Sequence, residues 1–366
     1  MTGNPFLGVL LHAIGGLAAA SFYVPYSKVK GWAWETFWIV GGLFSWLVAP
    51  WVVALIVAPD TVAILRSVGL SRMVWPFVFG LLWGVGGLTF GLSVRFLGVA
   101  LGYAIALGFC AAFGTLIPPI FDGTIGAVIA SQGGRVTLIG IGVCVLGIAI
   151  SGEAGRSREL DRPAEGREGD RKRFEFAKGV LVAVFAGVLS ASMSFAISAA
   201  SPIRLAAEAH HVPKLWANTP IYVVILLGGF ITNFAYCMYL RLQNRTGRDF
   251  ADRTQPLSRN YVLCVVGGVA WYLQFMFYGM GQTQMGKLEF SSWTLHMASI
   301  IIFSTLWGIG MREWSGTSRR TQRLVSAGLA VLILSTIVVG YGNYLDARSK
   351  QAAAATAGSA QKPPQG

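Results

Sequence analysis

The chain has 366 residues, of which 54% are hydrophobic and only 12% are charged, about half the charged fraction of a soluble domain. A soluble protein of this composition would expose large apolar patches, so the sequence predicts a polytopic membrane protein. The formal charge of +13 does not indicate nucleic-acid binding, because the basic residues lie in the connectors between apolar runs.

Runs of about 20 residues without Asp, Glu, Lys or Arg predict membrane-spanning helices, because lipid cannot satisfy an open backbone. The predicted fold class is an all-α integral membrane protein with ten transmembrane helices. The ten predicted spans lie near residues 6–25, 36–58, 73–94, 97–120, 136–152, 179–201, 217–240, 260–282, 290–311 and 324–344.

One long charged connector divides these spans into two groups of five. An odd number of spans in each half makes the second half begin on the opposite membrane face, so related halves would form two inverted five-helix repeats. A tryptophan and two glycines recur at the same spacing in the two halves, as Trp83, Gly91 and Gly98 and as Trp271, Gly279 and Gly286.

The predicted organisation is a first half at 1–152, a charged linker at 153–178, a second half at 179–344 and a disordered low-complexity tail at 345–366. The connectors after the odd-numbered spans carry 20 Lys and Arg residues, whereas the remaining connectors and the termini carry 9. Because cytoplasmic loops are enriched in Lys and Arg, we expect the linker in the cytoplasm and both termini in the periplasm.

The sequence contains no catalytic motif such as HExxH, a P-loop or GxSxG. The four cysteines lie in apolar runs without CxxC spacing, and we interpret them as small buried hydrophobic residues. The sequence therefore predicts neither an enzyme nor a bound cofactor or metal.

Ionisable groups within the spans or at their rims are the first functional candidates, because a charge in the bilayer is costly. In span nine, one helical face combines a carboxylate with an aromatic ring and an imidazole. An alternative is a carboxylate that complements the helix dipole beside a satisfied interior histidine. The face consists of Glu289, Ser292, Trp293 and His296.

Span eight carries a stripe of aromatic and amide side chains, at Trp271, Gln274, Phe275, Tyr278 and Gln282. Buried amides need partners, and the combination of amides with aromatic faces suits a sugar. The alternative is hydrogen bonding between helices together with aromatic core packing. A serine stripe in span six indicates an inward-looking face, at Ser190, Ser194, Ser198 and Ser201.

The segment YSKVKGWAWETFW (26–38) crowds charges and tryptophans between two apolar runs. Its tryptophans are typical interface anchors and its lysines can reach lipid phosphates. Glu35 then stands at the mouth of span two, as Glu289 stands at the mouth of span nine. The alternative interpretation of Glu35 is a partner of Lys28 and Lys30.

Four segments resemble the bacterial L-rhamnose–proton symporters of the drug/metabolite transporter superfamily. They are FYVPYSKVKGWAWETFWIVGGLFSW (22–46), FGLLWGVGGLTFGLSVRFLGVALGYAIALG (79–108), GGR (133–135), and WYLQFMFYG with SSWTLHM (271–297). The resemblance spans about residues 8 to 343 and implies import of L-rhamnose across the inner membrane, driven by the proton gradient without a cofactor.

The resemblance carries over the family's residues at His12, Tyr23, Lys28, Lys30, Trp34, Glu35, Trp271, Tyr272, Gln274, Trp293 and His296. At position 289 the family pattern has Asp, so this chain keeps an acid. Asp122 departs from the pattern and is not expected to couple protons.

We therefore expect proton coupling to involve Glu289, Glu35, His296 and His12. Glu289 is favoured as the proton carrier because His296 shares its helix face, and Glu35 is expected to act at a gate. The residues expected to contact a monosaccharide are Trp271, Tyr272, Gln274, Tyr278, Trp293, Trp34 and Tyr23.

The expected partners are L-rhamnose or a related monosaccharide, protons and the lipid bilayer. The alternative function is a drug/metabolite-type transporter or exporter of another sugar or small metabolite, because one fold serves many functions. A third class, a membrane sensor or scaffold, would need only small-residue packing, and the buried polar stripes argue against it.

Overall fold

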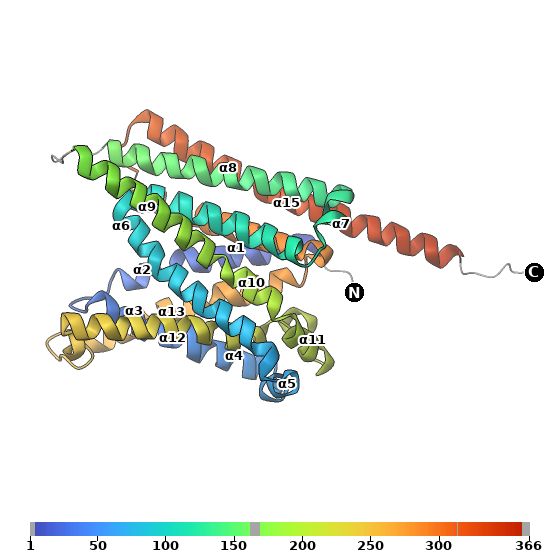
Figure 1. The fold of residues 1–366 in the computed structure, drawn as a ribbon, viewed down its shortest axis with the longest axis horizontal. Helices are drawn as coiled ribbons and strands as arrows, with labels where there is room; N and C mark the ends of the chain where they lie inside the picture. Colours follow the sequence, from blue (N-terminus) through green and yellow to red (C-terminus); the bar gives the residue numbers. More distant parts are fainter. Residues whose placement is uncertain (1–3, 162–168, 313, 361–366) are drawn as a thin grey trace, which may run out of the picture.

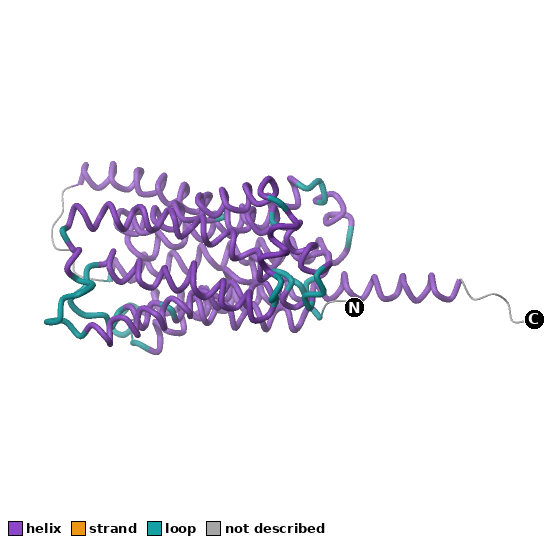
Figure 2. Tube along the Cα trace, turned by 90° about the horizontal axis from the view of Figure 1, so that it is seen from below, coloured by secondary structure: helices purple, strands orange, loops and turns teal. Residues whose placement is uncertain are grey.

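The structure, a computed structural model, describes residues 4–161, 169–312 and 314–360. Within these ranges the side chains of residues 91, 94–104, 159, 169–177 and 350–360 are not described. The described chain is helical and contains no strand. Figure 2 shows the helices running along one common direction, with the loops gathered at the two ends of the bundle.

The first half contains α1 (Pro5–Ser21), α2 (Tyr23–Tyr26), α3 (Trp34–Gly42), the π-helix η1 (Leu43–Val48), α4 (Ala49–Val57), α5 (Thr61–Val68), α6 (Leu70–Phe121), α7 (Ile125–Ala130) and α8 (Gln132–Leu160). The second half contains α9 (Gly169–Ser190), α10 (Ser192–Ala199), α11 (Ser201–Ala209), η2 (Lys214–Trp216), α12 (Thr219–Asn244), η3 (Thr246–Arg248), α13 (Leu257–Gln282), η4 (Gly286–Ser291), α14 (Ser292–Gly310) and α15 (Arg319–Ala360).

Nine segments of the described chain are long and apolar enough to cross a membrane, and each overlaps one of the predicted spans. The remaining prediction, span four at 97–120, falls on the second part of α6. A helix of 52 residues is about 78 Å long, far more than the roughly 30 Å of a bilayer core. Figure 1 shows α6 turning back on itself, and its second part includes the shorter apolar helix Ile105–Phe121.

Large apolar side chains cover the outside of the bundle. In water such a surface would favour aggregation, whereas in a bilayer it is solvated by lipid tails. Examples from five different helices are Ile56, Ile139, Leu181, Val262 and Ile337, each at least 60% exposed. The helical fold and this surface together indicate an integral membrane protein.

Two glycines let helices from the two halves approach closely. Gly80 of α6 lies against the backbone carbonyl of Ile225 in α12, and Gly268 of α13 lies against that of Gly41 in α3. A Cβ at either glycine would overlap the facing carbonyl, so only glycine fits.

A proline explains the irregular turn in the second span. Pro50 lacks an N–H, and its ring conflicts with the carbonyl four residues earlier, at Trp46. The helix widens to a π-helix over Leu43–Val48 just before this proline and continues as α4. The span from Trp34 to Val57 therefore stays unbroken.

The bundle has two ends that differ in the segments they contain. Figure 1 places the described N-terminal residues and the end of α15 at one end, which we call the terminal end. The end of α8 and the start of α9 lie at the opposite end, which we call the linker end. Short elements α5, α7 and α11 also lie at the terminal end, whereas the connector from α2 to α3 lies at the linker end.

The structure adds helices to the predicted linker and to the predicted tail. Helices α8 and α9 extend into the charged linker 153–178, of which residues 162–168 lie outside the described chain. Helix α15 continues to Ala360, where the sequence analysis expected a disordered tail (345–366). The reason is the alanine-rich stretch after residue 351, because alanine has the highest intrinsic helix propensity.

Candidate functional site

A cavity of about 550 Å³ lies at the terminal end of the bundle. Its walls come from the end of α6, from α7, α10 and α11, from the start of α12, from the end of α13 and from η4. This volume is in the usual range of small-molecule sites. The cavity could hold a monosaccharide.

An ion pair between Arg204 and Glu289 stands in the wall of this cavity. The Arg204 Nη1 lies 2.7 Å from the Glu289 Oε2, and the two side chains are 24% and 38% exposed. The pair joins α11 to η4. Glu289 is therefore in contact with the solvent of the cavity while its charge is balanced by a guanidinium.

Glu289 does not continue the helical face of α14, as the sequence analysis expected. Gly286 has a φ of +62° and Leu288 has non-helical backbone angles, so Glu289 belongs to the 3₁₀-helix η4 and α14 begins at Ser292. The expected stripe is broken for this reason. Trp293 and His296 are buried, with 3% and 1% exposure.

The serine stripe of span six faces inward, as predicted. Ser194, Ser198 and Ser201 all line the cavity. The Ser194 hydroxyl donates to the carbonyl of Gly114, and the Ser198 hydroxyl donates to Asp122 Oδ2 at 3.4 Å. This polar wall continues into Arg204.

A pair of amides forms another part of the wall. The Asn218 Nδ2 donates to the Gln282 Oε1 at 3.1 Å and to the Gly279 carbonyl at 3.0 Å. These two bonds fix the orientation of the Asn218 side chain, which is 2% exposed. Its Oδ1 has no hydrogen-bond partner in the described part of the chain.

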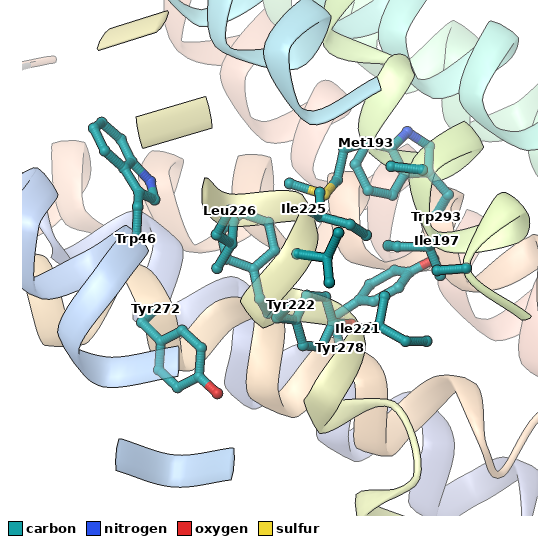
Figure 3. Packing of buried hydrophobic residues seen from close by; sticks show 14 of the residues in the cluster. Trp46, Met193, Ile197, Ile221, Tyr222, Ile225, Leu226, Tyr272, Tyr278 and Trp293 are labelled. Carbon is teal, nitrogen blue, oxygen red and sulfur yellow. The ribbon is translucent and has the colours of Figure 1, made fainter. Parts of the chain in front are cut away.

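Tyr278 separates the cavity from a buried polar cluster. It lines the cavity, and its ring centroid lies 5.3 Å from the ring of His12, 5.3 Å from that of His296 and 5.7 Å from that of Trp293. Figure 3 shows Tyr278 and Trp293 at the same side of the core cluster. Behind the tyrosine, the His296 Nε2 lies 3.3 Å from the Gln274 Oε1.

His12 is the most isolated polar group of this cluster. It is completely buried, and among the described residues neither ring nitrogen has a hydrogen-bond partner. A Cβ at Gly281 would lie 2.9 Å from the imidazole, so this glycine makes room for the ring. Buried polar groups without partners are rare, which favours a functional over a structural role.

The structure divides the expected sugar-contacting residues into three groups. Tyr278 lines the cavity, whereas Gln274 and Trp293 are buried behind it, the Trp293 Nε1 donating to the Cys110 carbonyl at 3.0 Å.

Two further residues, Trp271 and Tyr272, do not line the cavity. Trp271 packs on Phe22 at a ring distance of 4.2 Å, and Tyr272 is fully buried with an unpaired hydroxyl among the described residues.

Trp34 and Tyr23 form the third group. Trp34 stacks on Trp38 at 5.1 Å and is 37% exposed, and Tyr23 is 49% exposed. Tyr23 begins α2 and Trp34 begins α3, on either side of the connector at the linker end, far along the bundle from the cavity. They do not meet the other expected residues.

Glu35 is held at the linker end by neutral donors from the second half. It is 4% exposed and accepts hydrogen bonds from the Asn244 Nδ2 at 3.0 Å and the Thr246 Oγ1 at 2.8 Å. Lys28 and Lys30 are exposed and make no ion pair with it. The alternative interpretation paired Glu35 with these lysines, whereas in the structure its hydrogen-bond donors are the neutral amide of Asn244 and the hydroxyl of Thr246.

The same two chain segments are joined by further hydrogen bonds. Asp249 Oδ2 accepts from the Ala33 N–H and the Thr36 hydroxyl, each at 2.8 Å, and so satisfies two donors at the start of α3 from the other half. Asn260 bonds both the N–H and the carbonyl of Lys30. We call these contacts between residues 30–36 and 244–260 the latch.

A comparison with known proteins shows the family of the chain. The chain matches the family described as "L-rhamnose-proton symport protein (RhaT)" over residues 1–344. The chain belongs to the L-rhamnose–proton symporter family. This confirms the resemblance found in the sequence and places the chain among transporters rather than enzymes.

Curated members of the symporter family are similar over nearly their whole length. The L-rhamnose-proton symporter of Cronobacter sakazakii is 39% identical over 341 residues, which cover 92% of this chain and 97% of that protein. Those of Klebsiella pneumoniae and Shigella flexneri are each 38% identical over the same shares.

Sequence reasoning missed Arg204, Asn218 and Asp249. All three lie outside the apolar stripes of the predicted spans, at helix starts or in connectors. Arg204 could have been found, because it follows Ser201 by three residues and extends the serine stripe. Asn218 and Asp249 gave no comparable signal.

Proposed function

We propose that this chain is a proton-coupled symporter that imports L-rhamnose across the bacterial inner membrane. The observation that carries this proposal is a cavity of monosaccharide size separated by one tyrosine ring from a buried pair of histidines. The names of its relatives and its family supply the substrate and the driving ion. The proton gradient then supplies the driving force for transport, and no cofactor is required.

The architecture that fits this function consists of ten spans in two inverted repeats, at 1–152 and 179–344, joined by a cytoplasmic linker at 153–178. The two glycine contacts support it. Gly80 in the first half contacts Ile225 in the second half. Gly268, 188 residues after Gly80, contacts Gly41, 184 residues before Ile225. A contact and its repeat mate therefore exchange halves, as in repeats that are related by a two-fold axis.

Helix packing supports the same architecture. Helix α1 packs on α13, and the matching helices of the other half, α6 and α10, also pack together. Helix α14 packs on α15 as α6 packs on α8. Gly91 and Gly98, used in the sequence comparison, lie among residues whose side chains are not described.

In this function the cavity receives the sugar from the periplasm. The positive-inside rule orients the linker end toward the cytoplasm, so both termini and the cavity face the periplasm. The latch then closes the cytoplasmic side. Tyr278 would contact the sugar first, and Gln274 and Trp293 would take part when the sugar moves past Tyr278.

Four titratable groups lie along the bundle and provide a route for the coupled proton. Glu289 stands in the cavity wall, His12 and His296 lie behind Tyr278, and Glu35 lies in the latch. Protonation of Glu289 would release Arg204 and loosen the tie between α11 and η4. Sugar and proton would thereby act on the same cavity.

Uptake into liposomes that contain the purified protein tests the proposed function. With an alkaline interior, we expect labelled L-rhamnose to accumulate above its external concentration and to leave again when a protonophore is added. Empty liposomes are the control. Rhamnose uptake that is equal with and without the pH gradient would contradict proton coupling, and absence of uptake would contradict the assigned substrate.

A further inference from the structure

The amide pair of the cavity presents one hydrogen-bond acceptor and one donor group in fixed places. Because the Asn218 Nδ2 is used by Gly279 and Gln282, its Oδ1, a buried atom without a partner among the described residues, remains as an acceptor. Because the Gln282 Oε1 accepts from Asn218, the Gln282 Nε2 remains as a donor. Two adjacent hydroxyls of a sugar can donate to the first and accept from the second.

An apolar layer lies beneath the amides. Ile221 follows Asn218 by one turn of α12, and Tyr278 precedes Gln282 by one turn of α13, so each helix carries an amide at the terminal end and an apolar or aromatic group deeper in the bundle. Ile197 of α10 lines the same cavity. Figure 3 shows Ile197, Ile221 and Tyr278 grouped together.

We propose that this cavity binds a 6-deoxyhexose in one orientation, with two neighbouring hydroxyls on the Asn218–Gln282 pair and the methyl group against Ile197 and Ile221. This inference rests on the proposed function and adds the groups that select the sugar. A sugar that carries a hydroxyl in place of hydrogen at carbon 6 would place that hydroxyl in the apolar layer without a partner, which is unfavourable.

The matched pair of sugars for the test is L-rhamnose and L-mannose, which differ only by this hydroxyl. The measurement is displacement of labelled L-rhamnose from the purified protein by each unlabelled sugar. We expect wild-type protein to bind L-rhamnose about tenfold or more tightly than L-mannose. A wild-type ratio near one would overturn the proposed orientation.

Substitution of the apolar layer should change this ratio. In Ile221→Thr or Ile197→Thr, a hydroxyl faces the extra hydroxyl of L-mannose, so the preference for L-rhamnose should fall several-fold. Ile225→Thr is the matched control, because Ile225 is equally buried on α12 but does not line the cavity. An unchanged ratio in both cavity variants, or an equal decrease in the control, would overturn the proposal.

Substitution of the amides should weaken the binding of both sugars equally. Asn218→Leu and Gln282→Leu each remove a group that pairs with hydroxyls common to the two sugars, so affinity should fall about tenfold without a change in the ratio. Asn233→Leu is the control, since Asn233 is a buried amide of α12 that bonds Trp38 outside the cavity. Wild-type affinity in both cavity variants would overturn the role of the amides.

The two proposals fail in different ways. Wild-type protein that shows no gradient-driven uptake of L-rhamnose contradicts the proposed function. Wild-type protein that accumulates L-rhamnose, combined with cavity variants that keep the wild-type sugar ratio and affinity, contradicts only the orientation of the sugar.

Discussion

The carboxylates at the two ends of the bundle differ in exposure and in the charge of their partners. At the terminal end, Glu289 is partly exposed in a cavity and paired with the cation Arg204. At the linker end, Glu35 is almost completely buried and held by two neutral donors from the other half of the chain. One carboxyl group is open to the cavity, and the other is shielded from solvent.

This difference is what one state of an alternating-access transporter requires. A symporter exposes its site to one side of the membrane at a time, so one end must be open while contacts between the halves close the other. The latch supplies such contacts through Glu35, Asp249 and Asn260. We expect these contacts to break when the sugar moves to the other side.

The largest expected effect concerns which end faces which compartment. In spheroplasts, Ala130→Cys at the terminal end should react completely with an impermeant thiol reagent, whereas Ala251→Cys at the linker end should not react. Both alanines are exposed in the structure, and the four native cysteines are buried. The reverse labelling pattern would contradict the orientation from the positive-inside rule.

A smaller effect is expected when the latch is weakened. Asp249→Ala removes the acceptor of the Ala33 N–H and the Thr36 hydroxyl, and a typical hydrogen bond contributes about 0.5–1.5 kcal/mol. The linker end should open more often, and the native Cys264, buried in one cluster with Trp32, should react with a permeant maleimide up to about tenfold faster. Peptide mass spectrometry measures this rate.

Two comparisons separate opening from general unfolding. Asp252→Ala is the matched variant, because Asp252 lies in the same connector but its side chain accepts hydrogen bonds from Thr254 in its own loop. Cys144, buried between other helices, should stay unreactive in every variant. If Cys264 reacts with maleimide at the same rate in the wild type and in Asp249→Ala, the latch does not close this end.

Much of the fold follows from hydropathy, because a bilayer permits few structures. Nine spans could be predicted from apolar length alone, and the inward faces of spans six and eight follow from the spacing of their serines and amides. The tail could not be predicted in this way. Low complexity suggested disorder, but helix propensity made the alanine-rich residues up to 360 part of α15.

The site could be predicted only in part, since periodicity assumes an unbroken helix. It correctly placed Gln274 on an inward face of span eight, where the structure shows the Gln274 Oε1 3.3 Å from the His296 Nε2. Periodicity failed to place Glu289, because a glycine with positive φ starts a 3₁₀ turn there and ends the helical face. It also gave no information on partners from distant connectors, such as Asp249, because those contacts depend on how the two halves dock.

The most direct test of the account concerns which acid carries the coupled proton. Glu289→Gln mimics the protonated acid, so it should abolish gradient-driven accumulation of L-rhamnose in liposomes and still permit exchange when L-rhamnose is present on both sides. Arg204→Gln is the control, because it breaks the same ion pair and leaves the carboxyl group in place. It should retain measurable accumulation.

The account predicts loss of accumulation with retained exchange in Glu289→Gln, together with residual accumulation in Arg204→Gln. If Glu289→Gln accumulates L-rhamnose as the wild type does while Glu35→Gln does not, the coupled proton belongs to the latch and the account is contradicted.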